Sequence, residues 1–345
     1  MPIVSIITVA YNHGRFIKKC IESVLAQTMP DFEQIIVDDG STDTTAETVE
    51  QYCLKDARVR LVRHEHIGFY RMSELYNEAL AASRGKLVAV LDGDDYWPPW
   101  KLEQQIPAFA DENIVLAWGK VVVVNDEGSQ LAVAPTNSEQ YRRMNRAAAI
   151  RKLLLNCYMS SVTVMCRKSA LEMIGGFKQP HNIHSVDYPT WLALGPLGNF
   201  KFIDSVLGYW VKHGGSLSSR FSRSTAWCNC SIDAFEAMPQ DLKKQIGLTR
   251  PELIRLLQDR VDGAIDLDLE RVYSRSELVH LFEQHLAAST IQGVSPQIPL
   301  EVRRLNAPKS VARRLIRRAG SRLLRDHKWK GTVSSLRVAL ACLSL

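Results

Sequence analysis

Short β-branched runs alternate with longer amphipathic stretches along the first 125 residues of the chain. Residues 3–9 form a nearly continuous apolar run that predicts a buried strand, and apolar positions at helical spacing predict a helix over residues 14–27. The same alternation predicts strands at residues 32–37, 59–62 and 87–91 and helices at residues 41–54 and 72–83. Strands and helices that alternate at this spacing indicate a mostly parallel sheet with helices on both faces.

The pattern changes after residue 118. Residues 120–124 and 131–134 flank an Asn-Asp-Glu-Gly segment and predict a β-hairpin. The remaining predicted elements are a basic helix at residues 140–155, strands at 161–166 and 202–211, and helices beginning near Asp187 and at 251–257 and 274–286. We therefore expect an α/β domain over residues 1–219 and a helical C-terminal region over residues 220–345.

Composition narrows the class of protein. Of 345 residues, 46% are hydrophobic and 23% charged, which excludes a disordered or fibrous chain. Apolar stretches are shorter than the roughly 18 residues that a membrane-spanning helix needs, and no basic leader precedes the first apolar run, so a signal peptide is not expected. The seven cysteines form no CxxC pair. We expect the protein to be cytoplasmic.

Positive charge is concentrated near the C-terminus. Residues 303–337 hold twelve Lys or Arg and one acid, Asp326, for a net charge of +11, while the other residues hold 31 basic and 36 acidic side chains, for a net charge of −5. Apolar residues recur at helical spacing among these arginines. One interpretation is a helix on an anionic membrane, attaching the protein peripherally to the inner face of the cell membrane. The other is a solvated or packed helical bundle. Nucleic acid is not an expected partner, because the body is acidic.

Polar residues follow three of the predicted strands. The first strand runs into Thr8-Val9-Ala10-Tyr11-Asn12, the second into Asp38-Asp39-Gly40-Ser41, and the fourth into Asp92-Gly93-Asp94-Asp95. The carboxyl ends of parallel strands meet at one edge of the sheet, where ligands bind. Clustered carboxylates repel each other and favour a divalent cation, and oxygen ligands favour Mg²⁺ or Mn²⁺, which take further ligands from phosphates. A nucleoside diphosphate is the expected guest.

Three segments in order carry a family resemblance: IITVAYNHGRFIKKCIESVLAQT, QIIVDDGSTDTT and SRGKLVAVLDGDD. Together, over about residues 2–215, they resemble the family 2 glycosyltransferases of bacterial surface-polysaccharide type, which are inverting enzymes with the GT-A fold. The resemblance implies an α/β, Rossmann-like nucleotide-diphospho-sugar transferase fold. It assigns the cradle of the nucleotide to Thr8, Ala10, Tyr11 and Asp39. It places Asp92 and Gly93 at the ribose and Asp94 at the metal.

Further matches lie outside these segments. Residues 186–194, VDYPTWLAL, resemble the acidic helix of the family, whose Asp is the catalytic base. Val186 replaces a common Glu, so Asp187 is the candidate base, with a helix cap as the alternative. His213 matches a histidine that approaches the metal or the diphosphate, with a structural role as the alternative. Arg71 could reach the pyrophosphate by bidentate hydrogen bonding, although its spacing from Gly68 is longer than the family pattern.

These observations predict an inverting, metal-dependent glycosyltransferase. The resemblance implies Mn²⁺ or Mg²⁺ as cofactor, a UDP-sugar as donor with GDP and dTDP not excluded, and a hydroxyl of a glycan or lipid-linked acceptor. One alternative is a sugar-phosphate nucleotidyltransferase, although its glycine-rich phosphate loop is missing after the first strand. Another is an inactive relative that serves as a binding partner, which the combination of Asp39, Asp92, Asp94 and Asp187 disfavours.

Overall fold

The computed structural model describes residues 1–180, 183–215 and 225–258. The chain divides into two compact units, residues 1–222 with 229–253 and residues 223–228 with 254–345. The predicted domain boundary at 219/220, the predicted helix at 274–286 and the basic segment at 303–337 lie outside the described residues. Within the described residues, no helix is long and apolar enough to cross a membrane.

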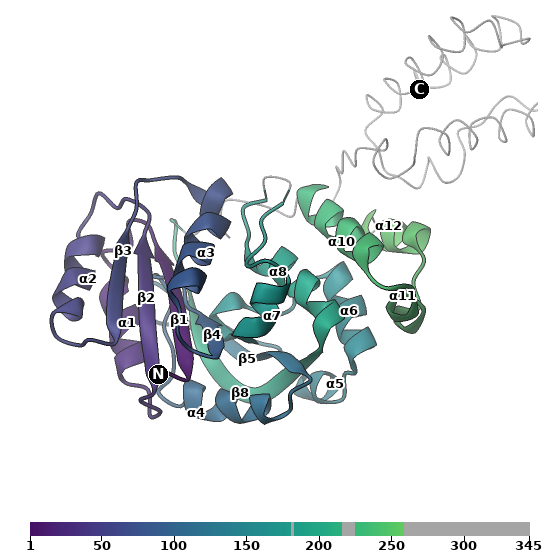
Figure 1. Cartoon of the computed structure of the whole chain (residues 1–345), viewed down its shortest axis with the longest axis horizontal. Helices are drawn as coiled ribbons and strands as arrows, with labels where there is room; N and C mark the ends of the chain where they lie inside the picture. Colours follow the sequence, from purple (N-terminus) through teal and green to yellow (C-terminus); the bar gives the residue numbers. More distant parts are fainter. Residues whose placement is uncertain (181–182, 216–224, 259–345) are drawn as a thin grey trace, which may run out of the picture. The chain divides into compact units, whose positions relative to one another are not determined.

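Four parallel strands form one half of the sheet (Figure 1). They are β1 (Val4–Ala10), β2 (Phe32–Asp38), β3 (Val59–Arg63) and β4 (Leu87–Val90), in the order β3-β2-β1-β4. Every residue of β1 and β2 is buried, which explains why apolar residues occupy both faces of these strands instead of alternating with exposed polar ones. The polar residues of β2, Glu33 and Gln34 among them, are buried as well. The prediction of a mostly parallel central sheet is confirmed.

The other half of the sheet is mixed. It is formed by β5 (Ile114–Asn125), β6 (Gln130–Ala134), β7 (Met165–Arg167) and β8 (Asn199–Lys212). Strand β7 joins the halves, because it pairs antiparallel with both β4 and β5. The predicted hairpin is present as β5 and β6, and β8 runs parallel to β5 along most of its length.

The helices follow from the direction of the crossovers. Helices α1 (Ile17–Leu25) and α2 (Thr45–Cys53) connect β1 to β2 and β2 to β3, whereas α3 (Met72–Ala82) leads from β3 back to β4 on the other side of β1. Since such crossovers are right-handed, α1 and α2 cover one face of the sheet and α3 the opposite face (Figure 1). The chain therefore reverses its winding between β1 and β4, which is where an open α/β sheet binds ligands.

The segment after β6 differs from the prediction. The single helix expected over residues 140–155 is two helices, α5 (Ser138–Arg142) and α6 (Arg146–Leu155). The break occurs because Asn145 has an extended backbone and its side chain accepts a hydrogen bond from the backbone N–H of Ala148 at 2.9 Å, which starts a new helix. The strand expected at 161–166 is likewise a short 3₁₀ turn, Ser161–Thr163, followed by β7.

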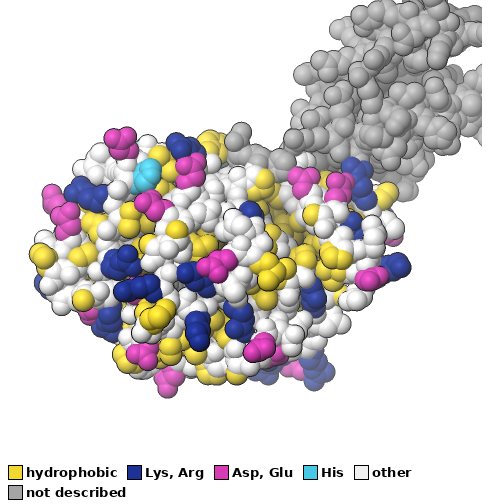
Figure 2. Space-filling view, in the orientation of Figure 1, with side chains coloured by type: hydrophobic (Ala, Val, Ile, Leu, Met, Phe, Trp, Pro, Cys, Tyr) yellow, Lys and Arg dark blue, Asp and Glu magenta, His cyan; other side chains and the backbone are white. Residues whose placement is uncertain are grey.

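Further helices complete the described residues. They are α4 (Lys101–Gln105), α7 (Lys168–Met173), α8 (Asp187–Leu194), α10 (Thr225–Ala237), α11 (Gln240–Ile246) and α12 (Arg250–Gln258), with 3₁₀ turns at Phe69–Arg71, Ile106–Ala110 and Gly195–Leu197. On the face drawn in Figure 2, Lys and Arg side chains are interspersed with Asp and Glu. That mixture agrees with the small net charge of the chain outside residues 303–337.

Candidate active site

The loops after β1 and β2 are joined by hydrogen bonds into one surface. Asn12 has a positive φ of 54°, and its side-chain oxygen accepts a hydrogen bond from the backbone N–H of Thr42 at 2.8 Å. The backbone N–H of Asn12 in turn donates to the hydroxyl of Ser41 at 2.9 Å. Asn tolerates this left-handed conformation better than most residues, which explains its use at this turn. The two loops thus hold Tyr11 and Asp39 side by side.

The predicted nucleotide cradle divides into an exposed and a buried part. Tyr11 is 40% exposed at the end of β1, whereas Asp39 is only 4% exposed. Thr8 and Ala10 are buried within the sheet, and the Thr8 hydroxyl accepts a hydrogen bond from the Gln34 side chain at 3.0 Å. Of the predicted cradle residues, Tyr11 is therefore the most exposed, and Thr8 and Ala10 are fully buried.

Three carboxylates follow β4 at the same edge of the sheet. The Tyr76 hydroxyl, from α3, donates a hydrogen bond to Asp92. Burial and the neighbouring Asp94 raise the pKa of Asp92 to about 7, against a smaller lowering by Tyr76. Burial and the charges of Asp94 and Asp92 also raise the pKa of Asp95. The Asp95 carboxylate accepts a hydrogen bond from the backbone N–H of Val211 at 2.9 Å, which fixes β8 against this loop.

Asp94 contacts His213, as the sequence predicts for a shared site. The Nε2 atom of His213 lies 3.0 Å from Oδ2 of Asp94, and both side chains are largely buried. Burial opposes ionisation of Asp94, but the hydrogen bond from His213 and the nearby His13 hold its pKa below the ordinary value. Among the three carboxylates after β4, Asp94 is therefore the one whose pKa is lowered.

His13 was not singled out from the sequence, yet it belongs to this cluster. Its Nδ1 atom is buried and has no hydrogen-bond partner among the described residues. A Cβ atom at Gly93 would lie 2.7 Å from that Nδ1 atom, so only glycine at position 93 leaves room for the imidazole. A buried polar atom without a partner costs free energy, which indicates that a ligand completes this site.

Asp94 and His213 are the candidate ligands for a divalent cation. In the described part of the chain, no three His, Cys, Asp or Glu side chains converge as a ligand group, so Asp94 and His213 stand as a pair. Mg²⁺ and Mn²⁺ need only one or two protein ligands when phosphate oxygens and water supply the others. Asp94 and His213 would thus supply two metal ligands, and phosphate oxygens and water would supply the others. The unpartnered Nδ1 atom of His13 is available to the same ligand.

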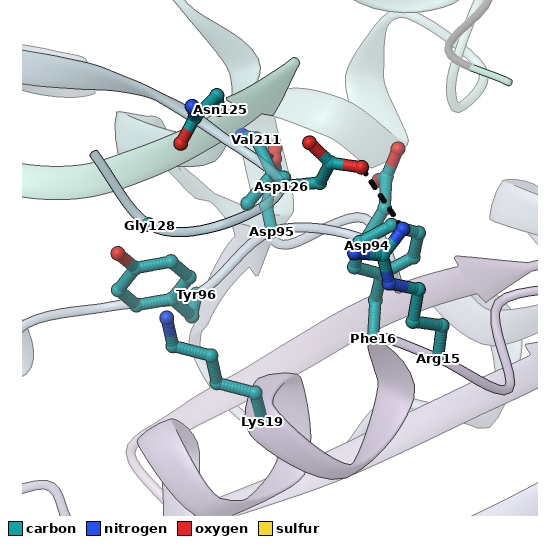
Figure 3. Close-up of a pocket in the computed structure, with 10 residues that line it drawn as sticks. All are labelled: Arg15, Phe16, Lys19, Asp94, Asp95, Tyr96, Asn125, Asp126, Gly128 and Val211. Atoms are coloured by element: carbon teal, nitrogen blue, oxygen red, sulfur yellow. Dashed lines mark hydrogen bonds and ion pairs between the residues drawn. The ribbon is translucent and has the colours of Figure 1, made fainter. Parts of the chain in front are cut away.

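A pocket with an empty volume of about 420 Å³ opens beside Asp94, between α1 and the turn of the β5–β6 hairpin (Figure 3). Arg15, in the turn just before α1, forms an ion pair with Asp126 of the hairpin turn at 2.9 Å. The Lys19 ammonium lies 3.5 Å from the centroid of the Tyr96 ring. The full lining is Arg15, Phe16, Lys19, Asp94, Asp95, Tyr96, Asn125, Asp126, Gly128 and Val211.

Asp187 is the first residue of α8, and Val186 precedes the helix as its cap. Burial raises the pKa of Asp187, while hydrogen bonds from the Ser185 hydroxyl and from backbone N–H groups oppose this increase. The Asp187 carboxylate is near enough to Asp92 to raise the pKa of that residue as well. The structure therefore brings Asp187 together with the carboxylates after β4, although 92 residues separate Asp187 from Asp95 in the sequence.

Arg71 does not join the cluster. It is exposed, and its guanidinium forms a bidentate pair with Glu74 one turn along, at 2.7 and 2.6 Å. Its predicted contact with a pyrophosphate remains a prediction. Of the site residues that the sequence did not indicate, His13 could have been found as a polar residue after the first strand, whereas Tyr76 lies on a helix whose face cannot be assigned to the site without the fold.

Comparisons with known sequences identify the family of this chain. Residues 5–175 match the family described as Glycosyl transferase family 2. A Bacillus subtilis protein named as a teichuronic acid biosynthesis glycosyltransferase, TuaG, is 31% identical over 193 residues, covering 56% of this chain and 72% of TuaG. The Escherichia coli UDP-Glc:alpha-D-GlcNAc-diphosphoundecaprenol beta-1,3-glucosyltransferase WfgD is 31% identical over 193 residues, covering 56% of this chain and 69% of WfgD.

Solved structures share the fold. Staphylococcus aureus TarS 1–349 in complex with UDP-GlcNAc has a TM-score of 0.54 and 20% identity, over 90% of this chain and 83% of TarS 1–349. The mannosyltransferase PcManGT of Pyrobaculum calidifontis, in complex with GDP-Man and Mn²⁺, has a TM-score of 0.51 and 18% identity, over 84% of this chain and 81% of the other. The predicted GT-A fold is confirmed.

Proposed function

This chain belongs to glycosyl transferase family 2 and is a glycosyltransferase, and we propose that it transfers a sugar with inversion from a UDP-sugar to a hydroxyl of a glycan or lipid-linked acceptor. The observation that carries the proposal is the gathering of Asp92, Asp94, His213 and Asp187 at the carboxyl edge of the sheet. WfgD, named for a UDP-Glc donor and a diphosphoundecaprenol-linked acceptor, supports this donor and acceptor class and a role in surface-polysaccharide synthesis.

The donor would bind at the carboxyl edge of the sheet, where the winding of the chain reverses between β1 and β4. Tyr11 and Asp39 would take the base, because a carboxylate accepts the imide N–H of uracil. Asp94 and His213 would hold Mn²⁺ or Mg²⁺, whose positive charge offsets the charge that develops on the departing diphosphate. The UDP-GlcNAc and GDP-Man complexes of proteins with this fold, the second with Mn²⁺, support a nucleotide sugar and a metal here.

Asp187 would act on the acceptor. Its carboxylate takes the proton of the acceptor hydroxyl while that oxygen forms a bond to the anomeric carbon, and the bond from this carbon to the diphosphate oxygen breaks. Attack from the face opposite the diphosphate inverts the anomeric configuration. A positioned base of this kind is worth about 10²–10⁴ in rate. Family membership favours this reaction over nucleotidyl transfer, for which Asp187 would have no role.

Calorimetry of UDP binding with Mn²⁺, repeated with EDTA, tests the metal assignment. We expect Asp94→Asn to weaken Mn²⁺-dependent UDP affinity by about tenfold or more, because it removes a charged metal ligand. Asp126→Asn is the matched control, since Asp126 lines the same pocket but pairs with Arg15. An Asp94→Asn protein with undiminished Mn²⁺-dependent affinity would show that the metal is held elsewhere. Hydrolysis of a panel of nucleotide sugars then identifies the donor.

A further inference from the structure

One face of the Tyr11 ring is covered by the side chain of His66, which lies in the loop after β3. The rings of Tyr11 and His66 are stacked, with 4.0 Å between their centroids and 21° between their planes. Two rings at this separation leave no space for a third planar group between them. A nucleobase can therefore stack on this face of Tyr11 only after the His66 ring has left it.

His66 also occupies the hydrogen-bonding edge of the cradle. Its Nδ1 atom lies 3.0 Å from Oδ2 of Asp39 and 3.0 Å from the backbone oxygen of Asp39. Both neighbours are acceptors, so Nδ1 must carry the proton and donate it. A uracil ring would offer the same combination, one N–H donor toward Asp39 and one flat face toward Tyr11.

The loop around Asp39 allows a nucleobase N–H to replace the His66 N–H as a hydrogen-bond donor to Asp39. The Asp39 carboxylate also accepts hydrogen bonds from the backbone N–H groups of Ile67 at 2.8 Å and Gly68 at 3.2 Å. Replacing the His66 N–H by a nucleobase N–H would keep three donors, within the roughly four that a carboxylate can accept. The His66 side chain is 46% exposed, so it can rotate into solvent while the loop backbone stays bound to Asp39.

The loop backbone itself is tightly seated. Gly40 has a positive φ of 68°, and a Cβ atom built on it would lie 2.6 Å from the backbone nitrogen of His66. This close contact holds the backbone of residue 66 above Asp39, so the imidazole has a fixed point from which to turn in and out.

We propose that His66 is an internal stand-in for the nucleobase of the donor, and that it sets donor affinity by competing for Tyr11 and Asp39. This inference rests on the proposed function, since it assumes that a nucleotide binds at these two residues. The observed affinity of a ligand falls with the fraction of protein in the competent state, so the inward position of His66 weakens donor binding.

UDP binding to His66→Ala, measured by calorimetry in Mn²⁺ on the full chain, tests the proposal. If the His66 ring covers the site about 70–90% of the time, the variant should bind UDP about three- to tenfold more tightly. Inorganic pyrophosphate lacks the base, so its affinity should not change. His64→Ala is the matched control, because its ring contacts the Glu65 backbone oxygen and the Glu78 carboxylate. The affinity of this control for UDP should equal that of the wild type.

The outcomes separate the two claims. If the wild-type chain binds UDP and His66→Ala binds it equally or more weakly, the stand-in role is wrong and the proposed function is untouched. If no protein in the set binds a nucleoside diphosphate, the proposed function fails and this inference fails with it. Tighter binding of UDP and pyrophosphate alike would point to a general change in the site and would overturn base competition.

Histidine NMR gives a second measurement that needs no variant to fold. A ring that leaves the face of Tyr11 loses the ring-current shift of that stack, so UDP should move the His66 Cε1–H resonance and leave that of His64 in place. A His66 resonance that does not move at saturating UDP would overturn the proposal.

Discussion

At the scale of single residues, the proposed mechanism depends on Asp187 as the base. Asp187→Asn keeps the size of the side chain but cannot accept the acceptor's proton, so transfer should fall by about 10² or more. UDP affinity should barely change, because the proposed base faces the acceptor. Single-turnover transfer and UDP calorimetry together check this. Activity within a few-fold of wild type, with the chemical step rate-limiting, would exclude Asp187 as the base.

The pH dependence of transfer supplies the control for the assignment of Asp187 as the base. Because burial raises the pKa of Asp187, the ionised base should be lost, as pH falls, at a higher pH than for an ordinary Asp near 3.9. The hydrogen bond from Ser185 opposes that rise. Ser185→Ala should therefore shift the acid limb of kcat/KM to higher pH, while a purely structural Asp187 would leave the limb in place.

At the scale of elements, a buried carboxylate joins three strands of the parallel sheet. Glu33 of β2 has a side chain only 1% exposed. It accepts hydrogen bonds from Ser5 of β1 at 2.8 Å and from Arg60 of β3 at 3.1 Å, and it pairs with Arg84 at 2.8 Å. Glu33→Gln removes the charge and one acceptor, so the free energy of unfolding should fall by about 1–3 kcal/mol. Denaturant unfolding measures the difference.

Two comparisons make this prediction specific. Glu50→Gln removes a pair with Arg63 in which both side chains are about half exposed, so it should cost less than about 1 kcal/mol. The pKa of Glu33 is lowered: burial opposes this, and hydrogen bonds from Arg84 and Ser5 outweigh it. Its stabilisation is thus present above the unfolded pKa of about 4.3 and is lost as pH falls through the lower folded value. Equal losses for both variants would contradict the role of burial.

At the scale of the whole molecule, the uneven charge predicts membrane association. The +11 segment at 303–337 contrasts with −5 over the other residues, and each basic side chain near an anionic surface contributes about 1 kcal/mol. Full-length protein should float with anionic liposomes and stay behind with neutral ones. Replacing Arg313, Arg314, Arg317 and Arg318 by Gln should abolish flotation. Equal partitioning of the two proteins would favour a packed helical region instead.

The parallel strands and their motifs could be predicted from the sequence, because they depend on local patterns. Strands buried on both faces are mostly apolar, and the polar residues that follow them mark one edge of the sheet. Strand ends predict the position of Asp39 and Asp94, whereas Asp187 is a candidate only through the family resemblance of residues 186–194. The break at Asn145 escaped prediction, since a cap within an amphipathic stretch leaves the apolar spacing almost unchanged.

The partner of each side chain was decided by the tertiary structure. Arg71 pairs with Glu74 instead of reaching the cluster, and the Thr8 hydroxyl points into the sheet. His66 lies on Tyr11 because the crossover after β3 brings that loop over the end of β1, a contact between residues 55 positions apart. The spacing of apolar residues along the sequence predicts which elements form and which of their residues are buried. Hydrogen bonds and ring contacts between loops depend on distances that exist only after the strands have paired.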